Sequence, residues 1–225
     1  MDEMIPPKNN HEQQLVISYL TLRKAVGILG ILLPVVLAIG VPIISNCNII
    51  QDSISDYYFT KMGSVFVGTL CAVGLFLFSY KGYERKDSIA SKLACLFALG
   101  VAFSPTYGPE ASSVCNFLHR NSNTWGSTVH DISAALFFLT LAYFSLYLFT
   151  KSSGKPTDNK LKRNIIYKVC GYTILGCIVL IVLYFKIPSL RSALQDYKPV
   201  FIMETLALWA FGFSWLTKGE FILKD

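Results

Sequence analysis

The chain contains 225 residues, of which 53% are hydrophobic and 15% charged, and its formal net charge is +6. Because about 25% charged residues is usual for soluble domains, this composition excludes an ordinary soluble globular protein. The positive charge needs no nucleic-acid partner to explain it. Most of it lies in the 151–164 loop and beside the apolar segments, where basic residues attract anionic lipid headgroups.

Six long apolar stretches are nearly free of ionisable residues, and a membrane-spanning helix needs about 20 such residues. In chain order they cover about 24–45, 62–80, 89–106, 128–150, 166–187 and 199–217. They do not alternate as the strands of outer-membrane barrels do, so we expect helices. The predicted fold is an all-α bundle of six transmembrane helices over 23–218. It is flanked by a 1–22 tail and a 219–225 tail, with no room for a second soluble domain.

Lysine and arginine residues predict the orientation of this bundle. With the N-terminus in the cytoplasm, one side of the membrane carries 15 of the 20 Lys and Arg residues. Cytoplasmic loops are enriched in these residues, so both termini are predicted to be cytoplasmic (N-in/C-in), which agrees with an even number of spans. The polar start of the chain lacks the features of a cleavable signal peptide, so the first span should remain as an anchor. We expect a multi-pass protein of a cell membrane, specifically a bacterial inner membrane.

The six cysteines divide between spans and loops. Cys47 and Cys115 fall in the first and second outer loops, which face an oxidising compartment in this topology. They can form a disulfide that ties the two loops together, or remain free thiols. The other four lie within spans, where cysteine behaves as a small packable hydrophobe.

The first outer loop contains the sequence Ser53-Ile-Ser-Asp-Tyr-Tyr. Ser53 and Asp56 have the spacing of a capping box, in which a hydroxyl and a carboxylate satisfy backbone N–H groups at a helix start. Alternatively, Ser53, Ser55 and Asp56 face a polar outer cavity and bind a ligand. The second outer loop, from Ser104 to about residue 127, is long enough to be functional and contributes His119.

His130 and Asp131 lie near the start of the fourth span, and Glu204 lies about one turn inside the sixth. Ionisable groups within spans are costly, so they usually face the bundle interior and find partners. Three interpretations remain open for these residues. They can hold a metal, although there are few histidines and no His-x-x-x-His; they can form an acid–base pair or a headgroup site without metal; or they can lock the bundle as a structural network. No metal ligand set and no cofactor are assigned.

Several motifs together resemble a known group of proteins. They are Ser53-Ile-Ser-Asp-Tyr-Tyr, Phe66-Val-Gly, Lys81-Gly-Tyr, His130-Asp-Ile-Ser-Ala-Ala-Leu-Phe-Phe and Phe211-Gly-x-Ser-Trp. The chain is similar, over about 20–220, to an uncharacterised bacterial family of six-span membrane proteins grouped with the Frag/DRAM/Sfk-like proteins. That resemblance implies a role linked to membrane lipids. There is also a remote likeness to ceramidase-type membrane hydrolases, whose His-x-x-x-His is absent from this chain.

The leading functional expectation is a membrane protein that binds lipid, or a protein partner in the membrane, through a polar cavity at its outer face. An alternative is a membrane-embedded lipid hydrolase or acyl transferase. Its base would be His130, its orienting group Asp131 or Glu204, and a metal or Ser55 would complete the site. A transporter or channel is the third candidate. No nucleic-acid partner is expected.

Overall fold

A computed structural model describes residues 10–45, 47–80, 84–106, 124–152 and 154–223, and all their regular secondary structure is helical. In chain order the elements are α1 (Asn10–Ser45), the 3₁₀ turn η1 (Ser55–Phe59), α2 (Gly63–Phe78), α3 (Arg85–Phe103), α4 (Thr124–Tyr143), the π-helical turn η2 (Phe144–Leu148), α5 (Asp158–Lys186), α6 (Pro188–Leu194), the 3₁₀ turn η3 (Gln195–Tyr197) and α7 (Pro199–Lys218). The expected all-α fold is confirmed, and a long helix lies at each of the six predicted segments.

Four stretches of these helices are long and apolar enough to cross a membrane: Tyr19–Ser45, Trp125–Leu148, Asp158–Lys186 and Pro199–Lys218. The apolar helix α2 is shorter, with 16 residues, and the charged first turn of α3 keeps that helix outside this group. Large hydrophobic side chains such as Ile43 and Val169 lie exposed on the outer faces of the long helices. These features suggest an integral membrane protein, in agreement with the composition.

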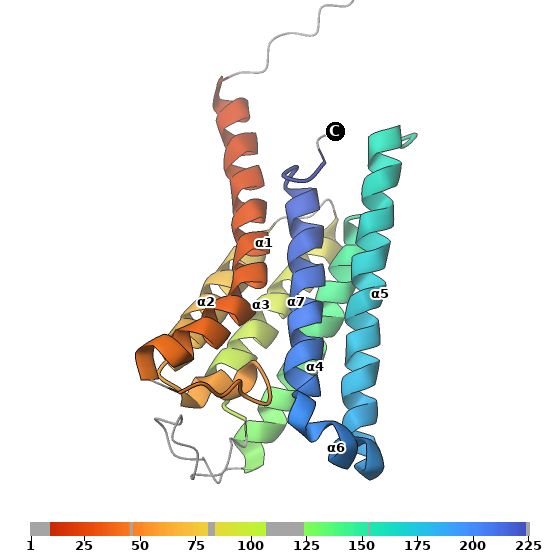
Figure 1. Cartoon of the computed structure of the whole chain (residues 1–225). Coiled ribbons are helices and arrows are strands. Elements are labelled where there is room, and N and C mark those ends of the chain that lie inside the picture. The colour runs from red at the N-terminus through yellow and green to blue at the C-terminus, as the bar shows by residue number, and fades with distance from the viewer. Residues whose placement is uncertain (1–9, 46, 81–83, 107–123, 153, 224–225) are drawn as a thin grey trace, which may run out of the picture.

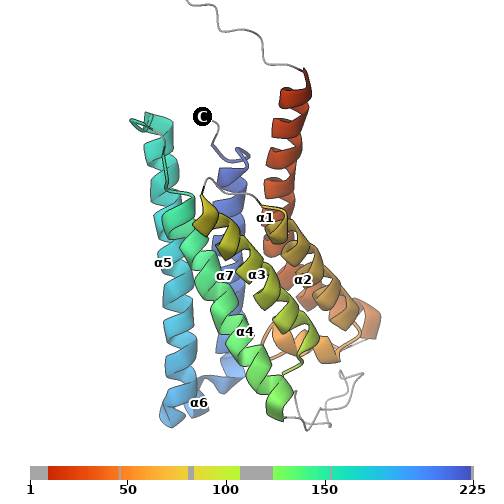
Figure 2. The ribbon, with the colours of Figure 1, turned by 180° about the vertical axis from the view of Figure 1, so that it is seen from behind.

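The helices form two layers. Figure 1 shows α7 between α1 and α5 in one layer, and Figure 2 shows α4, α3 and α2 in the layer behind it. The start of α1 and the end of α7 lie at the same end of the bundle, which we call the terminal end. The turn η1 and helix α6 lie at the opposite end, which we call the site end.

The helix α4 continues into a π-helical turn, η2, in which the Phe149 N–H donates to the Phe144 carbonyl at 2.9 Å. A π turn contains one extra residue and rotates the side chains that follow it around the helix axis. Phe144 and Phe149 are both fully buried here, whereas Tyr147 between them is exposed. The turn therefore places two rings in the core that a regular helix would direct to different faces.

Helices α1 and α7 approach closely through two glycines. A Cβ atom added at Gly212 would lie 2.7 Å from the Gly27 carbonyl oxygen, and one added at Gly27 would lie 2.8 Å from the Gly212 oxygen. Small residues at such contacts let two helix backbones pack directly, which matters in membranes because apolar burial gives little driving force there. By contrast, a Cβ atom added at Gly68 of α2 would meet nothing within 4 Å.

Gly212→Ala should therefore lower the free energy of unfolding by about 1–3 kcal/mol, the usual cost of overpacking. The matched change Gly68→Ala should be neutral or stabilise by up to about 1 kcal/mol, because alanine favours a helix more than glycine does. Chemical denaturation of both variants in the same detergent would measure the difference. Equal stability of the two variants would contradict the close contact between α1 and α7.

Candidate functional site

A half-open pocket of about 980 Å³ lies at the site end, between η1, α4, α5, α6 and the start of α7. Its polar part is lined by the polar and charged side chains Asp52, Ser53, Ser55, Asp56, Thr106, Ser127, His130, Asp131, Lys186, Arg191, Gln195, Lys198 and Glu204. Its wall is formed by apolar and aromatic side chains of α4 and α5, namely Ala134, Ala135, Phe138, Ile178, Ile181, Val182, Tyr184 and Phe185. The pocket thus has a polar part and an apolar part.

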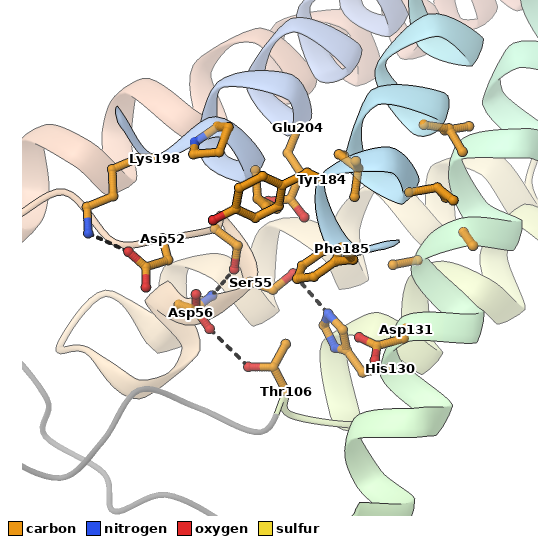
Figure 3. A pocket seen from close by; sticks show the side chains of 18 of the residues that line it. Asp52, Ser55, Asp56, Thr106, His130, Asp131, Tyr184, Phe185, Lys198 and Glu204 are labelled. Atoms are coloured by element: carbon orange, nitrogen blue, oxygen red, sulfur yellow. Dashed lines mark hydrogen bonds and ion pairs between the residues drawn. The ribbon is translucent and has the colours of Figure 1, made fainter. Parts of the chain in front are cut away.

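At the centre of the polar part, Ser55 and His130 share a hydrogen bond. Ser55 Oγ lies 2.9 Å from His130 Nε2, and His130 Nδ1 lies 2.6 Å from the Ser104 carbonyl oxygen. A carbonyl oxygen only accepts, so Nδ1 carries a proton and donates it to this bond. In the neutral imidazole Nε2 is then an acceptor, and the Ser55 hydroxyl donates to it (Figure 3).

Close packing of α3 on α4 explains the position of His130. A Cβ atom added at Gly100 would lie 2.4 Å from Ser133 Oγ, so only a glycine lets the two helices approach at this level. Ser133 lies on the same face of α4 as His130, because residues three apart are neighbours on a helix. The approach brings the His130 ring against the end of α3, where the Ser104 carbonyl is available to it.

Glu204 holds the loop that leads into η1. Its Oε2 atom accepts a hydrogen bond of 2.6 Å from the backbone N–H of the buried Ile54. The predicted inward-facing carboxyl of the last long helix therefore has a partner, but that partner is a backbone N–H and not His130. Glu204 positions the segment that carries Ser55 rather than orienting the imidazole.

Both contacts of the predicted capping box at Ser53 and Asp56 are present. Ser53 Oγ accepts from the Asp56 N–H at 3.1 Å, and the Asp56 carboxyl accepts from the Ser53 backbone N–H. The Asp56 carboxyl also accepts from the Thr106 hydroxyl, at 3.1 Å, and so ties η1 to the segment after α3. Burial raises the pKa of Asp56, with nearby Asp52 adding to the effect, while hydrogen bonds from Ser53 and Thr106 act in the opposite direction.

This raised pKa predicts a pH dependence of stability. A carboxyl whose pKa is higher in the folded than in the unfolded protein stabilises the fold below its unfolded pKa of about 4. That contribution is lost as the pH rises through the folded pKa. Asp56→Asn should remove this dependence and be more stable than the wild type at pH 7, while keeping an acceptor for Thr106. The free energy of unfolding of both proteins should be measured at pH 4 and pH 7. An equal change between the two pH values in the wild type and the variant would contradict the prediction.

Asp131 lies beside His130 on α4 but is exposed, and none of the described residues donates a hydrogen bond to it. Two neighbouring helix residues point about 100° apart, which explains why the carboxylate does not reach the His130 ring. The orienting role that the sequence assigned to Asp131 or Glu204 is filled by the Ser104 carbonyl. Asp131 instead adds negative charge to the lining of the pocket.

Three cations that the sequence analysis did not assign to the site lie around the mouth: Lys186, Arg191 and Lys198. Lys198 adopts a left-handed backbone conformation with φ of 53°, which turns the chain from η3 into α7. Its ammonium group forms an ion pair with Asp52, and the Phe201 N–H donates to the Asp52 carbonyl at 3.0 Å. These contacts hold the start of α7 against the loop before η1.

Two predicted site residues, His119 and Cys115, lie outside the described residues. Cys47 is disulfide-bonded, whereas Cys71, Cys95, Cys170 and Cys177 are free thiols. The pairing of Cys47 with Cys115 remains a prediction. Within the described part of the chain, no group of three or more His, Cys, Asp or Glu side chains is placed to hold a metal ion.

A second set of buried charges at the terminal end was not expected from the sequence. Arg23 stacks on Tyr19 at 4.3 Å from the ring centroid, and Lys160 donates to the Phe149 carbonyl at 2.7 Å. Lys151 bridges to Asp87, which is buried in the first turn of α3. Long basic side chains can bury their stems on apolar or aromatic surface near a membrane interface, so this set is consistent with anchoring of the helix ends.

The chain matches no protein-family model, no curated protein and no solved structure. The resemblance to the Frag/DRAM/Sfk-like group therefore stays a prediction from the motifs. The described residues form a helical bundle with four helices long and apolar enough to cross a membrane, and a pocket with a polar and an apolar part lies at the site end.

Proposed function

We propose that this protein spans a bacterial inner membrane six times, with both termini in the cytoplasm, and binds a membrane lipid in the pocket at the outer face. One observation carries the proposal: a single pocket has charged groups of both signs at its mouth and a continuous apolar wall along α4 and α5. An amphipathic ligand needs these two environments side by side.

The topology rests on the distribution of basic residues over the two ends of the bundle. In the predicted six-span topology 15 of the 20 Lys and Arg residues fall on the same side of the membrane as the two termini, which supports a cytoplasmic location for that side by the positive-inside rule. We count α2 and α3 as the other two spans, because they pack on one another, α2 also packs on α1, and α3 also packs on α4. The site end then faces the periplasm, the compartment in which a disulfide at Cys47 is stable.

The pocket suits a lipid in size as well as in chemistry. Its volume of about 980 Å³ lies near the upper end of the range typical for ligand sites, roughly 300–1,000 Å³. Lys186, Arg191 and Lys198 can receive a phosphate, and the acidic groups opposite them can receive an amine. Along α4 and α5, Ala135 and Val182 leave room for an acyl chain.

The test uses lipid that stays bound during purification in mild detergent, counted by native mass spectrometry. Ala135→Phe fills the apolar wall at an exposed position and should reduce bound lipid at least several-fold. Ala193→Phe makes the same change at an exposed position on α6 outside the pocket lining and should leave bound lipid unchanged. The thermal unfolding of both variants should match that of the wild type.

Three results would contradict lipid binding in the pocket. Equal lipid content in the two variants would place the lipid elsewhere on the protein. A protein partner that is lost from Ala135→Phe while bound lipid is unchanged would indicate a partner-binding surface. If the wild type binds no lipid but conducts ions or protons in proteoliposomes, and Ala135→Phe blocks that flux, the protein is a transporter.

A further inference from the structure

We infer that Ser55 and His130 are a nucleophile and general base that transfer an acyl group from a carboxylic ester of a lipid held in the pocket. The inference rests on the proposed lipid binding and adds a reaction to it. It is carried by the hydrogen bond from Ser55 Oγ to His130 Nε2 and by the position of both residues in the lining of the pocket.

The hydrogen bonds of His130 fix the tautomer of its neutral imidazole. Because Nδ1 donates to the Ser104 carbonyl at 2.6 Å, the proton of a neutral ring is fixed on Nδ1, and Nε2 presents its lone pair to the hydroxyl. An activated serine requires such a base within about 2.6–3.2 Å, and the observed distance is 2.9 Å. The Ser104 carbonyl takes the place that a carboxylate occupies in the Ser-His-Asp arrangement, since it holds the tautomer and the ring orientation.

Ser55 and His130 can be reached from the pocket but are shielded from bulk solvent. Ser55 and His130 are buried, with 7% and 3% of their surfaces exposed, yet both contribute to the pocket lining. Figure 3 shows the Phe185 ring on the α5 side of the pair, and this ring belongs to the pocket lining. A lipid whose chain follows the α4 and α5 wall would bring a carbonyl group near the mouth to the serine. The limited exposure would restrict the access of bulk water to the reacting atoms.

A structural role alone does not account for the pair. The loop before η1 is already attached to α7 through Glu204 and through the backbone bond between Phe201 and Asp52. Asp56 and Thr106 join η1 to the end of α3 in addition. The Ser55–His130 bond is therefore not needed to hold η1 in place, although it costs the burial of two polar side chains.

The reaction balances without any co-reactant beyond an acyl acceptor. Ser55 Oγ forms a bond to the ester carbonyl carbon while His130 Nε2 takes the hydroxyl proton. When the tetrahedral intermediate collapses, the carbon–oxygen bond to the leaving alcohol breaks and His130 returns the proton to that alcohol. Water or a second lipid hydroxyl then attacks the acyl-serine, His130 removes its proton, and the proton returns to Ser55 Oγ as the acyl group leaves.

The experiment treats the purified full-length protein in nanodiscs with a long-chain alkyl fluorophosphonate and locates the adduct by mass spectrometry of peptides. In the wild type we expect one adduct on Ser55, formed as the serine oxygen displaces fluoride from phosphorus. His130→Ala should slow the labelling at least 100-fold, within the range for loss of a general base. Ser192→Ala is the matched control: it removes an exposed serine of α6 that lies outside the pocket lining and donates to the Ser189 carbonyl, and Ser55 in this variant should be labelled at the wild-type rate.

Two outcomes would overturn the inference, and both are separable from failure of lipid binding. If the wild type retains bound lipid but gives no adduct on Ser55, the pocket binds lipid without this chemistry. If His130→Ala, shown to be folded by thermal unfolding, is labelled at the wild-type rate, His130 is not the base. An absence of bound lipid in the wild type would instead contradict the proposed function itself.

Discussion

Replacing Trp215 with alanine should lower the free energy of unfolding by about 3–5 kcal/mol, the usual cost of removing a large buried aromatic side chain. Trp215 is 1% exposed, and its ring lies 5.2–5.9 Å from the rings of Tyr80, Phe144, Phe149 and Phe211. These rings come from α7, from η2 with the residue that follows it, and from the segment just after α2, so the alanine variant would open a cavity where three segments meet. Denaturation in detergent, followed by near-ultraviolet circular dichroism, would measure the loss.

Two further substitutions test whether lost packing causes the loss of stability in Trp215→Ala. Trp215→Phe should cost less than about 1.5 kcal/mol, because it keeps most of the ring volume and removes an indole N–H. That N–H is buried and has no hydrogen-bond partner among the described residues. Trp125→Ala changes the same residue type at a position that is 78% exposed and should have little effect. A similar loss in Trp125→Ala would show that the Trp215 cluster is not the centre of the core.

Glu204→Leu should lower the free energy of unfolding by roughly 2–3 kcal/mol and reduce bound lipid at the same time. The leucine has a similar size but cannot accept the hydrogen bond of the Ile54 N–H, which would remain buried without a partner. The segment carrying Ser55 would lose its attachment to α7. Chemical denaturation and native mass spectrometry on one preparation would report both effects.

Glu204→Gln is the variant to compare with Glu204→Leu. Glutamine keeps an oxygen that can accept from the Ile54 N–H, so its stability should lie within about 1 kcal/mol of the wild type. If the Gln and Leu variants were equally destabilised, the charge of Glu204, rather than its bond to Ile54, would determine stability. If neither were destabilised, the bond would contribute nothing measurable.

The helices could be predicted from the sequence because each apolar stretch is long and nearly free of ionisable residues. Boundaries moved mainly at polar ends: α5 begins at Asp158 rather than near residue 166, where Thr157 caps the helix by accepting from the Lys160 N–H. Hydropathy averages over windows of about 20 residues, so it cannot reveal η1, the seven-residue α6 or the π turn after Tyr143. The six-span count and the orientation remain predictions.

The sequence allowed us to predict which residues form the candidate site better than which partners they contact. Asp56, His130, Asp131 and Glu204 were expected at one end of the bundle, and the structure brings all four into one pocket. The partner of His130 Nδ1 is a backbone carbonyl, which every residue possesses, so no side-chain pattern could identify it. Lys198 and Asp52 are 146 residues apart, and their pairing depends on the turn at Lys198.

The burial of Arg23, Lys160 and Arg163 could not be predicted for a different reason. Basic residues near span ends were interpreted only as signals of orientation, which says nothing about whether they point into the bundle. Arg163 Nε donates to the Tyr167 hydroxyl at 3.3 Å, one helical turn away, so aromatic residues at the same end receive these cations. In the sequence, Arg23 and Arg163 each lie four residues from a tyrosine, and this spacing was the available indication that they contact aromatic rings.

The apolar wall of the pocket determines in which concentration units its affinity for the proposed lipid ligand must be expressed. Val182 and Phe185 belong to this wall, yet half or more of each side chain is exposed on the outer surface of α5, where lipid would surround the bundle. A ligand arriving along this side diffuses in two dimensions and never dissolves in water. Occupancy should follow its mole fraction among the surrounding lipids, so doubling the total lipid at fixed composition should leave occupancy unchanged.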